Sequence, residues 1–267
     1  MSIWHVCECR RVVFVGLLLN REFTILPSSN PSLAIWLTGV IPIVDMQRAI
    51  EKTVSQAAHL QYSQPMLILC EHEKAITVGR SGSRQDIACS DEDLALQGIP
   101  LMFIGRGGGA VMHAPGQLGI YLFGSLESLG YSIDTLGIFI DRFHEGIKRA
   151  LLDVRANPIR HDTMHGLFGR TGLLVAIGLS VRHGVVCHGA FVNVSSQCGI
   201  ARRVFSTPRG PMGSIESDLQ RRVGMASVRS CIVTRLCETL GVEPKSVQSG
   251  VPFREVQAKN KGVRNVG

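Results

Sequence analysis

The sequence lacks several features that would assign a function directly. Its eight cysteines form no Cys-x-x-Cys pair, which argues against a zinc site, and a chain of 267 residues rarely depends on a disulfide scaffold. Aromatic residues make up only 6% of the chain, few for a surface that stacks nucleic-acid bases, and no long block of Lys and Arg is present. The composition therefore predicts no metal, no nucleic-acid partner and a reducing compartment, the cytoplasm.

Long hydrophobic runs are also missing. The longest one near the N-terminus, residues 12–19, is interrupted by Gly16 and is too short to span a bilayer. No small-residue cleavage pattern follows it, so we expect neither a membrane segment nor a secretion signal. The Pro- and Ser-rich residues 27–32 predict a linker. We therefore expect an N-terminal extension over residues 1–38, a core domain over 39–243 and a basic tail over 244–267.

The chain does have enough apolar residues, 45%, to fill one hydrophobic core, and a net charge of +7 that favours an acidic partner. Apolar positions three and four residues apart predict helices over 45–57, 134–154 and 228–240. Short apolar runs predict strands at 66–70, 75–78, 100–104, 118–123, 173–177 and 190–194. These elements mix without strict alternation, which predicts a mixed α/β or α+β fold, with helices packed on a mixed sheet.

The most informative stretch runs from Arg106 to Gln117 and reads RGGGAVMHAPGQ. A backbone without Cβ atoms lets a ligand approach closely, and Arg106 offers five N–H donors beside the titratable ring of His113. The apolar runs on both sides predict a strand, a ligand-binding loop and a second strand. No Gly-Lys-Ser/Thr follows, so this is not the pattern of a P-loop at a helix N-terminus.

Four local motifs in this order make the chain resemble the octanoyltransferase (lipoyl/octanoyl transferase) family, relatives of lipoate and biotin protein ligases. They are LCEH then TVGR (69–72 and 77–80), the glycine loop, AIG (176–178), and HGAFVNV then CGI (188–194 and 198–200). The resemblance implies a biotin/lipoate protein ligase-like catalytic domain. It also implies octanoyl transfer from octanoyl-acyl carrier protein to lipoyl domains of 2-oxoacid dehydrogenase and glycine cleavage complexes, the first step of protein lipoylation.

The resemblance further implies roles for individual residues. Cys198 would carry the octanoyl group as a thioester in a monomeric enzyme that needs no cofactor. Because the thiolate is the reactive form of cysteine, a nearby base is expected, and His188 and His113 are the candidates. Backbone N–H groups of the glycine loop would bind the thioester oxygen. The implied acyl site comprises Arg106, Gly107, Gly108, Gly109, Ala110, Val111, Met112, His113, Ala176, Ile177, Gly178, His188, Gly189 and Ala190.

The sequence departs from the family at several of these positions. The family's activating lysine falls on Leu173, and no lysine lies between residues 148 and 245. The segment 194–198 is shorter than in the family, and the family's Thr, Tyr and Gly in the loop are here Val111, Met112 and Ala114. Three interpretations stay open: an imidazole replaces the lysine, the chain binds acyl carrier or lipoyl domains without turnover, or it is an ATP-dependent lipoate or biotin ligase-like enzyme.

Overall fold

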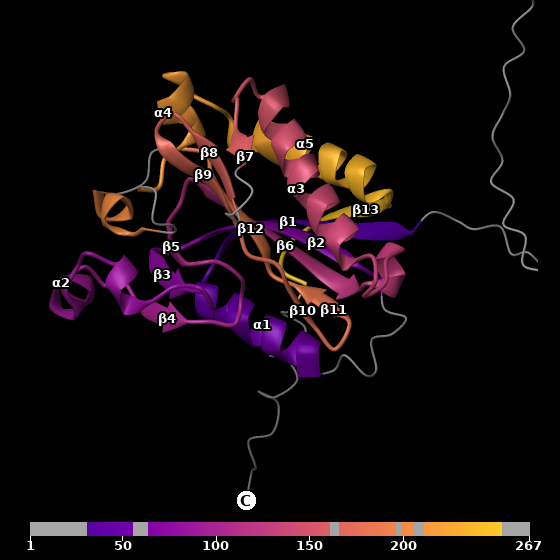
Figure 1. Cartoon of the computed structure of the whole chain (residues 1–267), viewed down its shortest axis with the longest axis horizontal. Helices are drawn as coiled ribbons and strands as arrows, with labels where there is room; N and C mark the ends of the chain where they lie inside the picture. Colours follow the sequence, from indigo (N-terminus) through magenta and orange to yellow (C-terminus); the bar gives the residue numbers. More distant parts are fainter. Residues whose placement is uncertain (1–30, 56–63, 161–165, 196–198, 206–210, 253–267) are drawn as a thin grey trace, which may run out of the picture.

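The strands of the protein belong to two sheets. The computed structural model describes residues 31–55, 64–160, 166–195, 199–205 and 211–252 (Figure 1). Within these ranges the large sheet contains β1 (Ser32–Ile41), β2 (Met66–His72), β6 (Gln117–Ser125), β7 (Ile159–Arg160), β8 (Gly166–Gly169), β9 (Gly172–Ile177), β10 (Ser180–Arg182), β11 (Val185–Cys187), β12 (Gly189–Asn193) and β13 (Glu243–Ser249). The small sheet contains β3 (Ala75–Val78), β4 (Leu101–Phe103) and β5 (Ala110–His113).

The large sheet is mixed. Its main path runs β13-β1-β2-β6-β12-β9-β8-β7, and the β10–β11 hairpin joins it through β11 and β6. β13, β1 and β2 are parallel, whereas the pairs from β2 through β6, β12 and β9 to β7 are antiparallel. This arrangement confirms the mixed α/β fold expected from the sequence.

Helices cover both faces of the large sheet. They are α1 (Ile43–Ser55), α2 (Asp91–Leu96), α3 (Leu136–Asp153), α4 (Ile215–Leu219) and α5 (Met225–Leu240), together with the 3₁₀ turns η2 (Arg84–Asp86), η3 (Glu127–Leu129) and η4 (Gly199–Arg203). Figure 1 shows α3 and α5 side by side over one face, with α1 and the small sheet on the other. No helix in the described ranges combines the length and apolar character needed to cross a membrane.

The strict alternation of side chains along β2 produces two cores. Leu67 and Leu69 pack toward α3 and α5, whereas Ile68 and Cys70 pack toward Met46 of α1 and the small sheet. Successive residues of a strand point to opposite faces, so a strand buried on both faces must be apolar at every position. This is why β2 and β6 read as continuous apolar runs in the sequence rather than as alternating ones.

The helices predicted from apolar spacing are present, with shifted ends. α3 begins at Leu136, after the N-cap residue Thr135, two residues later than the predicted start at residue 134. α5 ends before Gly241, whose φ of 69° is in the left-handed region that glycine adopts without strain. α1 begins at Ile43, two residues before the predicted start at residue 45.

The sheet extends past both of the domain bounds expected from the sequence. Residues 32–38, expected in the extension, belong to β1, which pairs with β2 and β13. All of β13 except its first residue, Glu243, lies in the expected tail, and β13 is an edge strand of the sheet. Its sequence EPKSVQS is polar because an edge strand is exposed, and Pro is tolerated at such an edge. Residues 1–30 and 253–267 lie outside the described residues.

Candidate active site

Three of the motif segments meet at one end of β9 and β12. The two strands pair with Ala190 opposite Ile177, and the N–H of Gly178 donates to the carbonyl oxygen of Gly189 at 2.8 Å. The glycine loop packs directly on this pair, since a Cβ added to Gly178 would lie only 2.7 Å from the Gly107 oxygen. The fold therefore brings together the loop, AIG and HGA segments that the sequence placed in one site.

The glycine loop, residues 105–109, turns its carbonyl groups toward the protein. The Gly105 oxygen accepts from the guanidinium groups of Arg80 and Arg182. The Arg106 oxygen accepts from the Arg80 N–H, and the Gly107 oxygen accepts from the Arg106 side chain. The Gly108 oxygen accepts from the Ser81 N–H, and the Gly109 oxygen accepts from the Gly79 N–H. None of the five loop N–H groups donates a hydrogen bond within the described part of the chain. Backbone N–H groups without a protein acceptor are available to a ligand.

The second half of the predicted loop is not a loop. Residues 110–113 form β5, pair with β3 and are buried, so Ala110, Val111 and Met112 pack in the core. The Met112 N–H lies 3.4 Å from the Met212 sulfur. The apolar side chains at positions 111 and 112, where the family has hydroxyl-bearing residues, thus belong to the apolar core between the small sheet and the large one.

The Arg106 side chain faces the interior, whereas the sequence suggested that it faces a ligand. It is only 2% exposed, and its Nη2 donates to the carbonyl oxygen and the Oγ1 of Thr77 at 2.8 and 2.9 Å. Its Nη1 donates to the Gly107 oxygen at 2.9 Å. Burial lowers the Arg106 pKa to about 10, so the group remains a cation at neutral pH. Arg106 holds the glycine loop on β3.

A directed chain of buried hydrogen bonds starts at Thr77. Because its Oγ1 accepts from the arginine, its own proton goes to Nε2 of His113 at 2.7 Å, and Nδ1 then donates to Gln117 at 2.8 Å. The Gln117 amide donates to Asn193 at 2.9 Å, and the Asn193 amide donates to the Leu173 carbonyl oxygen at 2.9 Å. Both ring nitrogens of His113 are therefore occupied, which leaves His113 as a positioning residue.

Sequence reasoning assigned no role to the polar side chains that build this chain. Thr77, Gln117 and Asn193 all lie inside the quoted motifs and on strands, and two of them stand among apolar residues: Thr77 in AITV and Asn193 in GAFVN. Each is at most 2% exposed. Because buried polar groups require partners, a polar residue in an otherwise apolar strand is the signal that could have identified them.

His188 differs from His113 in having a ring nitrogen without a partner. Its side chain is 2% exposed, its φ is 62°, and no described residue bonds to its Nδ1. Burial lowers the pKa of His188 to about 3, with further lowering by the charges of Arg106, Arg182 and Arg80. The ring is neutral at pH 7, and its Nδ1 is the candidate proton acceptor of the site.

The described cysteines near the site are thiols, and they lack the character of nucleophiles. Burial raises the pKa of Cys70, whose sulfur lies 3.6 Å from Nε2 of His72, and it also raises the pKa of Cys187. Both ring nitrogens of His72 have hydrogen-bond partners, because its Nδ1 contacts the Ile41 oxygen at 2.6 Å and its Nε2 contacts the Tyr121 hydroxyl at 2.7 Å. No group of His, Cys, Asp and Glu in the described ranges could hold a metal ion. The predicted nucleophile, residue 198, lies outside the described residues.

Leu173, at the position of the family's lysine, is apolar and lies in apolar surroundings. Leu173 is 1% exposed and lies in the core cluster that contains Phe168 and Met212. It forms an isolated β-bridge with Met212, and its N–H donates to the Pro211 oxygen at 3.2 Å. A leucine in this place cannot move a proton, so any base must come from elsewhere.

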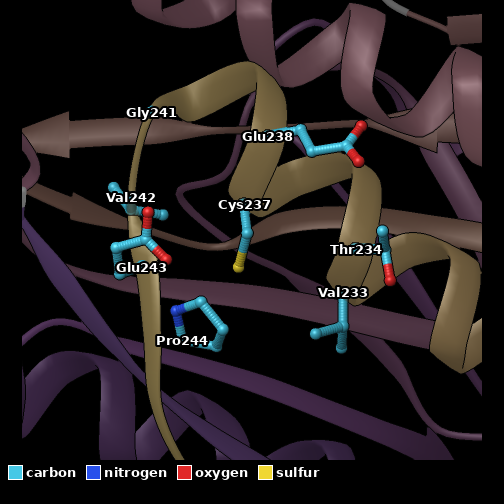
Figure 2. Close-up of a pocket in the computed structure, with 8 residues that line it drawn as sticks. All are labelled: Val233, Thr234, Cys237, Glu238, Gly241, Val242, Glu243 and Pro244. Atoms are coloured by element: carbon cyan, nitrogen blue, oxygen red, sulfur yellow. The ribbon is translucent and has the colours of Figure 1, made fainter.

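A separate pocket lies between the end of α5 and the start of β13 (Figure 2). It has a volume of about 340 Å³ and is lined by Val233, Thr234, Cys237, Glu238, Gly241, Val242, Glu243 and Pro244. Burial raises the pKa of Cys237 to about 11, so its thiol is protonated at neutral pH. None of the sequence motifs contributes a residue to this pocket, which makes it a weaker candidate for chemistry.

Acid should destabilise the protein through its buried histidines. The pKa is lowered to about 4 for His72 and about 3 for His188, and well below 6.5 for His113, in each case mainly by burial. The unfolded chain therefore binds more protons below pH 6.5, and stability is lost as pH falls. Each histidine contributes about 1 kcal/mol between pH 6.5 and 5.5, so urea unfolding should show a loss of about 3 kcal/mol.

The matched variant for this measurement is His188→Asn, because asparagine tolerates the left-handed backbone of residue 188. This variant should lose about one third less free energy of unfolding than the wild type between pH 6.5 and 5.5. Equal stability of the wild type at both pH values would contradict the buried, neutral state of these rings.

Comparisons with known proteins identify the family of the chain. Residues 44–237 match the family model of the lipoyl protein ligase A/B catalytic domain. An octanoyltransferase of Roseiflexus sp. (strain RS-1) is 27% identical over 77% of this chain and 87% of its own length. An octanoyltransferase of Bacteroides fragilis (strain YCH46) is 30% identical over 65% of this chain and 80% of its own. The chain therefore belongs to this family, as a divergent member of its octanoyltransferases, which are acyltransferases.

Solved structures confirm the fold. A bi-partite lipoate protein ligase from Thermoplasma acidophilum superposes with a TM-score of 0.63 at 16% identity, covering 83% of this chain and 88% of its own. A lipoate-protein ligase A bound with ATP gives a TM-score of 0.64 at 16% identity, over 82% and 90% of the two chains. The lipoate protein ligase-like fold that the resemblance implied is thus confirmed.

Proposed function

We propose that the protein transfers an octanoyl group from octanoyl-acyl carrier protein to a lysine of a lipoyl domain, with Cys198 carrying the group as a thioester. The observation that best supports this is the packing of the glycine loop on Gly178 and of Gly178 on Gly189, because it assembles the segments shared with octanoyltransferases. The net charge of +7 suits an acidic carrier protein as donor. The proposed acceptors are lipoyl domains of 2-oxoacid dehydrogenase and glycine cleavage complexes in the cytoplasm.

The chemistry takes place in two balanced steps. In the first, the thiol proton of Cys198 passes to Nδ1 of His188 while the sulfur attacks the thioester carbonyl carbon. The new C–S bond forms and the carrier's C–S bond breaks. The carrier thiolate then takes the proton from His188. In the second, the lysine amine attacks the same carbon, the Cys198–acyl bond breaks, and His188 passes the amine proton to the Cys198 sulfur.

His188 is proposed as the base because it offers a free ring nitrogen, whereas His113 uses both of its nitrogens. With a His188 pKa of about 3, the imidazolium does not accumulate at neutral pH. The proton must therefore move in the same event as the attack of sulfur on carbon, and must be released as the carrier thiol leaves. His113 then acts through the Gln117–Asn193 hydrogen bonds that fix the backbone of β9.

The direct test is intact-protein mass spectrometry after incubation with octanoyl-acyl carrier protein, followed by addition of a lipoyl domain. We expect the mass of one octanoyl group on the wild type, and its transfer to the acceptor lysine as an amide. The absence of both the adduct and the octanoylated acceptor would refute the proposal.

A second candidate, a non-catalytic protein that binds acyl carrier or lipoyl domains, is favoured by one observation. Leu173 is not a mobile surface side chain; it is integrated into the core with Met212, as in a site that no longer needs a base there. The same incubation separates the two candidates, because a binder would retain the carrier on a size-exclusion column and yet form neither adduct nor product.

A further inference from the structure

The pocket between α5 and β13 combines apolar walls, a thiol and negative charge. Its walls include Val233 and Pro244, and Figure 2 shows the Cys237 sulfur pointing into the space between them. Burial raises the pKa of Cys237 to about 11, and the charges of Glu243 and Glu238 contribute to this rise. The last carbonyl groups of α5 add the partial negative charge of a helix C-terminus. The pocket therefore suits an apolar group that carries a cation beside it.

The size of the pocket limits what can fill it. Its volume of about 340 Å³ lies at the lower end of the roughly 300–1,000 Å³ range of ligand pockets. A cavity of about 150 Å³ holds one benzene ring in an apolar protein core. The pocket therefore has room for two apolar side chains, and is too small for a folded partner.

The chain enters the large sheet directly beside this pocket. The described residues begin at Pro31, whose carbonyl oxygen accepts from the Glu243 N–H at 2.8 Å. Ser32 and Leu33 of β1 then pair with Glu243 and Pro244, two of the residues that line the pocket. Because β1 and β13 are parallel, both strands begin at this end of the sheet. The residues that precede Pro31 are therefore joined to the protein at the pocket.

The sequence before β1 contains a segment with the matching chemistry. Residues 21–26 read REFTIL, here called the REFTIL segment, and the Pro- and Ser-rich residues 27–30 connect it to β1. Arg21 is a cation, Phe23 and Ile25 are apolar, and their spacing of two directs all three to one side of an extended chain. Four connecting residues span up to about 14 Å, enough for the segment to return to the pocket.

We propose that the pocket between α5 and β13 is the binding site for the REFTIL segment of the same chain. Phe23 and Ile25 occupy the space between the apolar walls, and Arg21 lies beside the Glu243 carboxylate. The bound segment covers the Cys237 thiol, so the reactivity of this thiol reports on binding. None of these residues belongs to the proposed site of octanoyl transfer.

The test measures alkylation of Cys237 by N-ethylmaleimide in the native full chain at one fixed pH, followed by peptide mass spectrometry. Phe23→Ser should raise the rate at Cys237 roughly 10-fold or more, because burying one phenylalanine changes the binding equilibrium by at least about this factor. Phe14→Ser, the same change outside the REFTIL segment, is the matched control and should react as the wild type. Cys231, half-buried on the same helix and not part of the pocket lining, is the internal reference and should react equally in all variants.

The charge of the segment is tested separately. Arg21→Glu should raise the rate at Cys237 by about 3-fold or more, because it places a carboxylate beside the carboxylates of the pocket. Arg21→Lys keeps the charge and should keep the protection. Arg11→Glu makes the same reversal of charge outside the segment and should react as the wild type.

The outcomes distinguish the possible occupants of the pocket. Equal rates at Cys237 in the wild type and in Phe23→Ser overturn the proposal. A wild-type rate that falls as the protein concentration rises, and that Phe23→Ser leaves unchanged, overturns it in favour of a second copy of the chain. A rate that rises in Phe23→Ser and Arg21→Glu but in neither control supports it, whether or not the protein transfers octanoyl groups.

Discussion

Leu173→Lys is expected to lower the free energy of unfolding by about 4 kcal/mol at pH 7, because an ammonium at a position that is 1% exposed has its pKa lowered by three to five units. Below pH 10.4 the lysine amine is protonated in the unfolded chain, whereas burial keeps it neutral in the folded chain. The unfolded chain therefore binds more protons, and the free energy of unfolding rises with pH. About 3 kcal/mol should be regained between pH 7 and pH 10. Urea unfolding of variant and wild type at both pH values measures the difference.

The control is Leu173→Met, which keeps the volume and apolar character of the side chain and should cost less than about 1.5 kcal/mol at either pH. A Leu173→Lys protein that is as stable as the Met variant at pH 7 would contradict the expectation. It would mean that an anion lies within reach of residue 173.

Much of the fold could be predicted because buried elements carry a strong apolar pattern. β2, β3, β6, β9 and β12 are apolar at nearly every position, and their runs were found in the sequence. β13 was missed because an exposed edge strand has no apolar face to detect. β5 was missed for another reason: its four residues lie inside a motif that resembles a loop, and only pairing with β3 makes them a strand.

The meeting of the motif segments was predicted from the sequence more successfully than the directions of their side chains. Sequence motifs identify which segments meet, but the direction of a side chain depends on the strand and partners around it. Arg106 and His113 were expected to face a ligand, and both are turned inward by Thr77. Arg182 was overlooked because a single arginine between apolar strands has no distinguishing pattern, and only the fold places it beside Arg80.

The backbone at residue 173 is held independently of its side chain. The chain of hydrogen bonds through Gln117 and Asn193 ends on the Leu173 carbonyl oxygen, and the Gly213 N–H donates to the same oxygen at 3.0 Å. A polar framework of this kind is costly to bury unless every member is satisfied. Its presence around an apolar side chain indicates that the framework serves to position β9, whatever residue occupies position 173.

Cys198→Ser is expected to abolish the octanoyl adduct and to reduce transfer to a lipoyl domain by roughly a thousandfold or more, the scale on which removing a covalent nucleophile acts. A serine hydroxyl is far harder to ionise than a thiol, and a base with a pKa of about 3, as in His188, cannot compensate for this. Intact-mass measurements with octanoyl-acyl carrier protein would give the amount of adduct, and single-turnover measurements would give the rate of transfer.

Cys187→Ala is the matched control, since this cysteine precedes His188 in the chain and is fully buried, with a pKa raised by that burial. It should keep the adduct and most of the transfer rate, because a thiol excluded from solvent and held protonated offers no thiolate to the donor. An adduct that survives in Cys198→Ser and disappears in Cys187→Ala would reverse the assignment. It would require His188 to act as the base for the thiol of Cys187, and Cys187 to leave the core during the reaction.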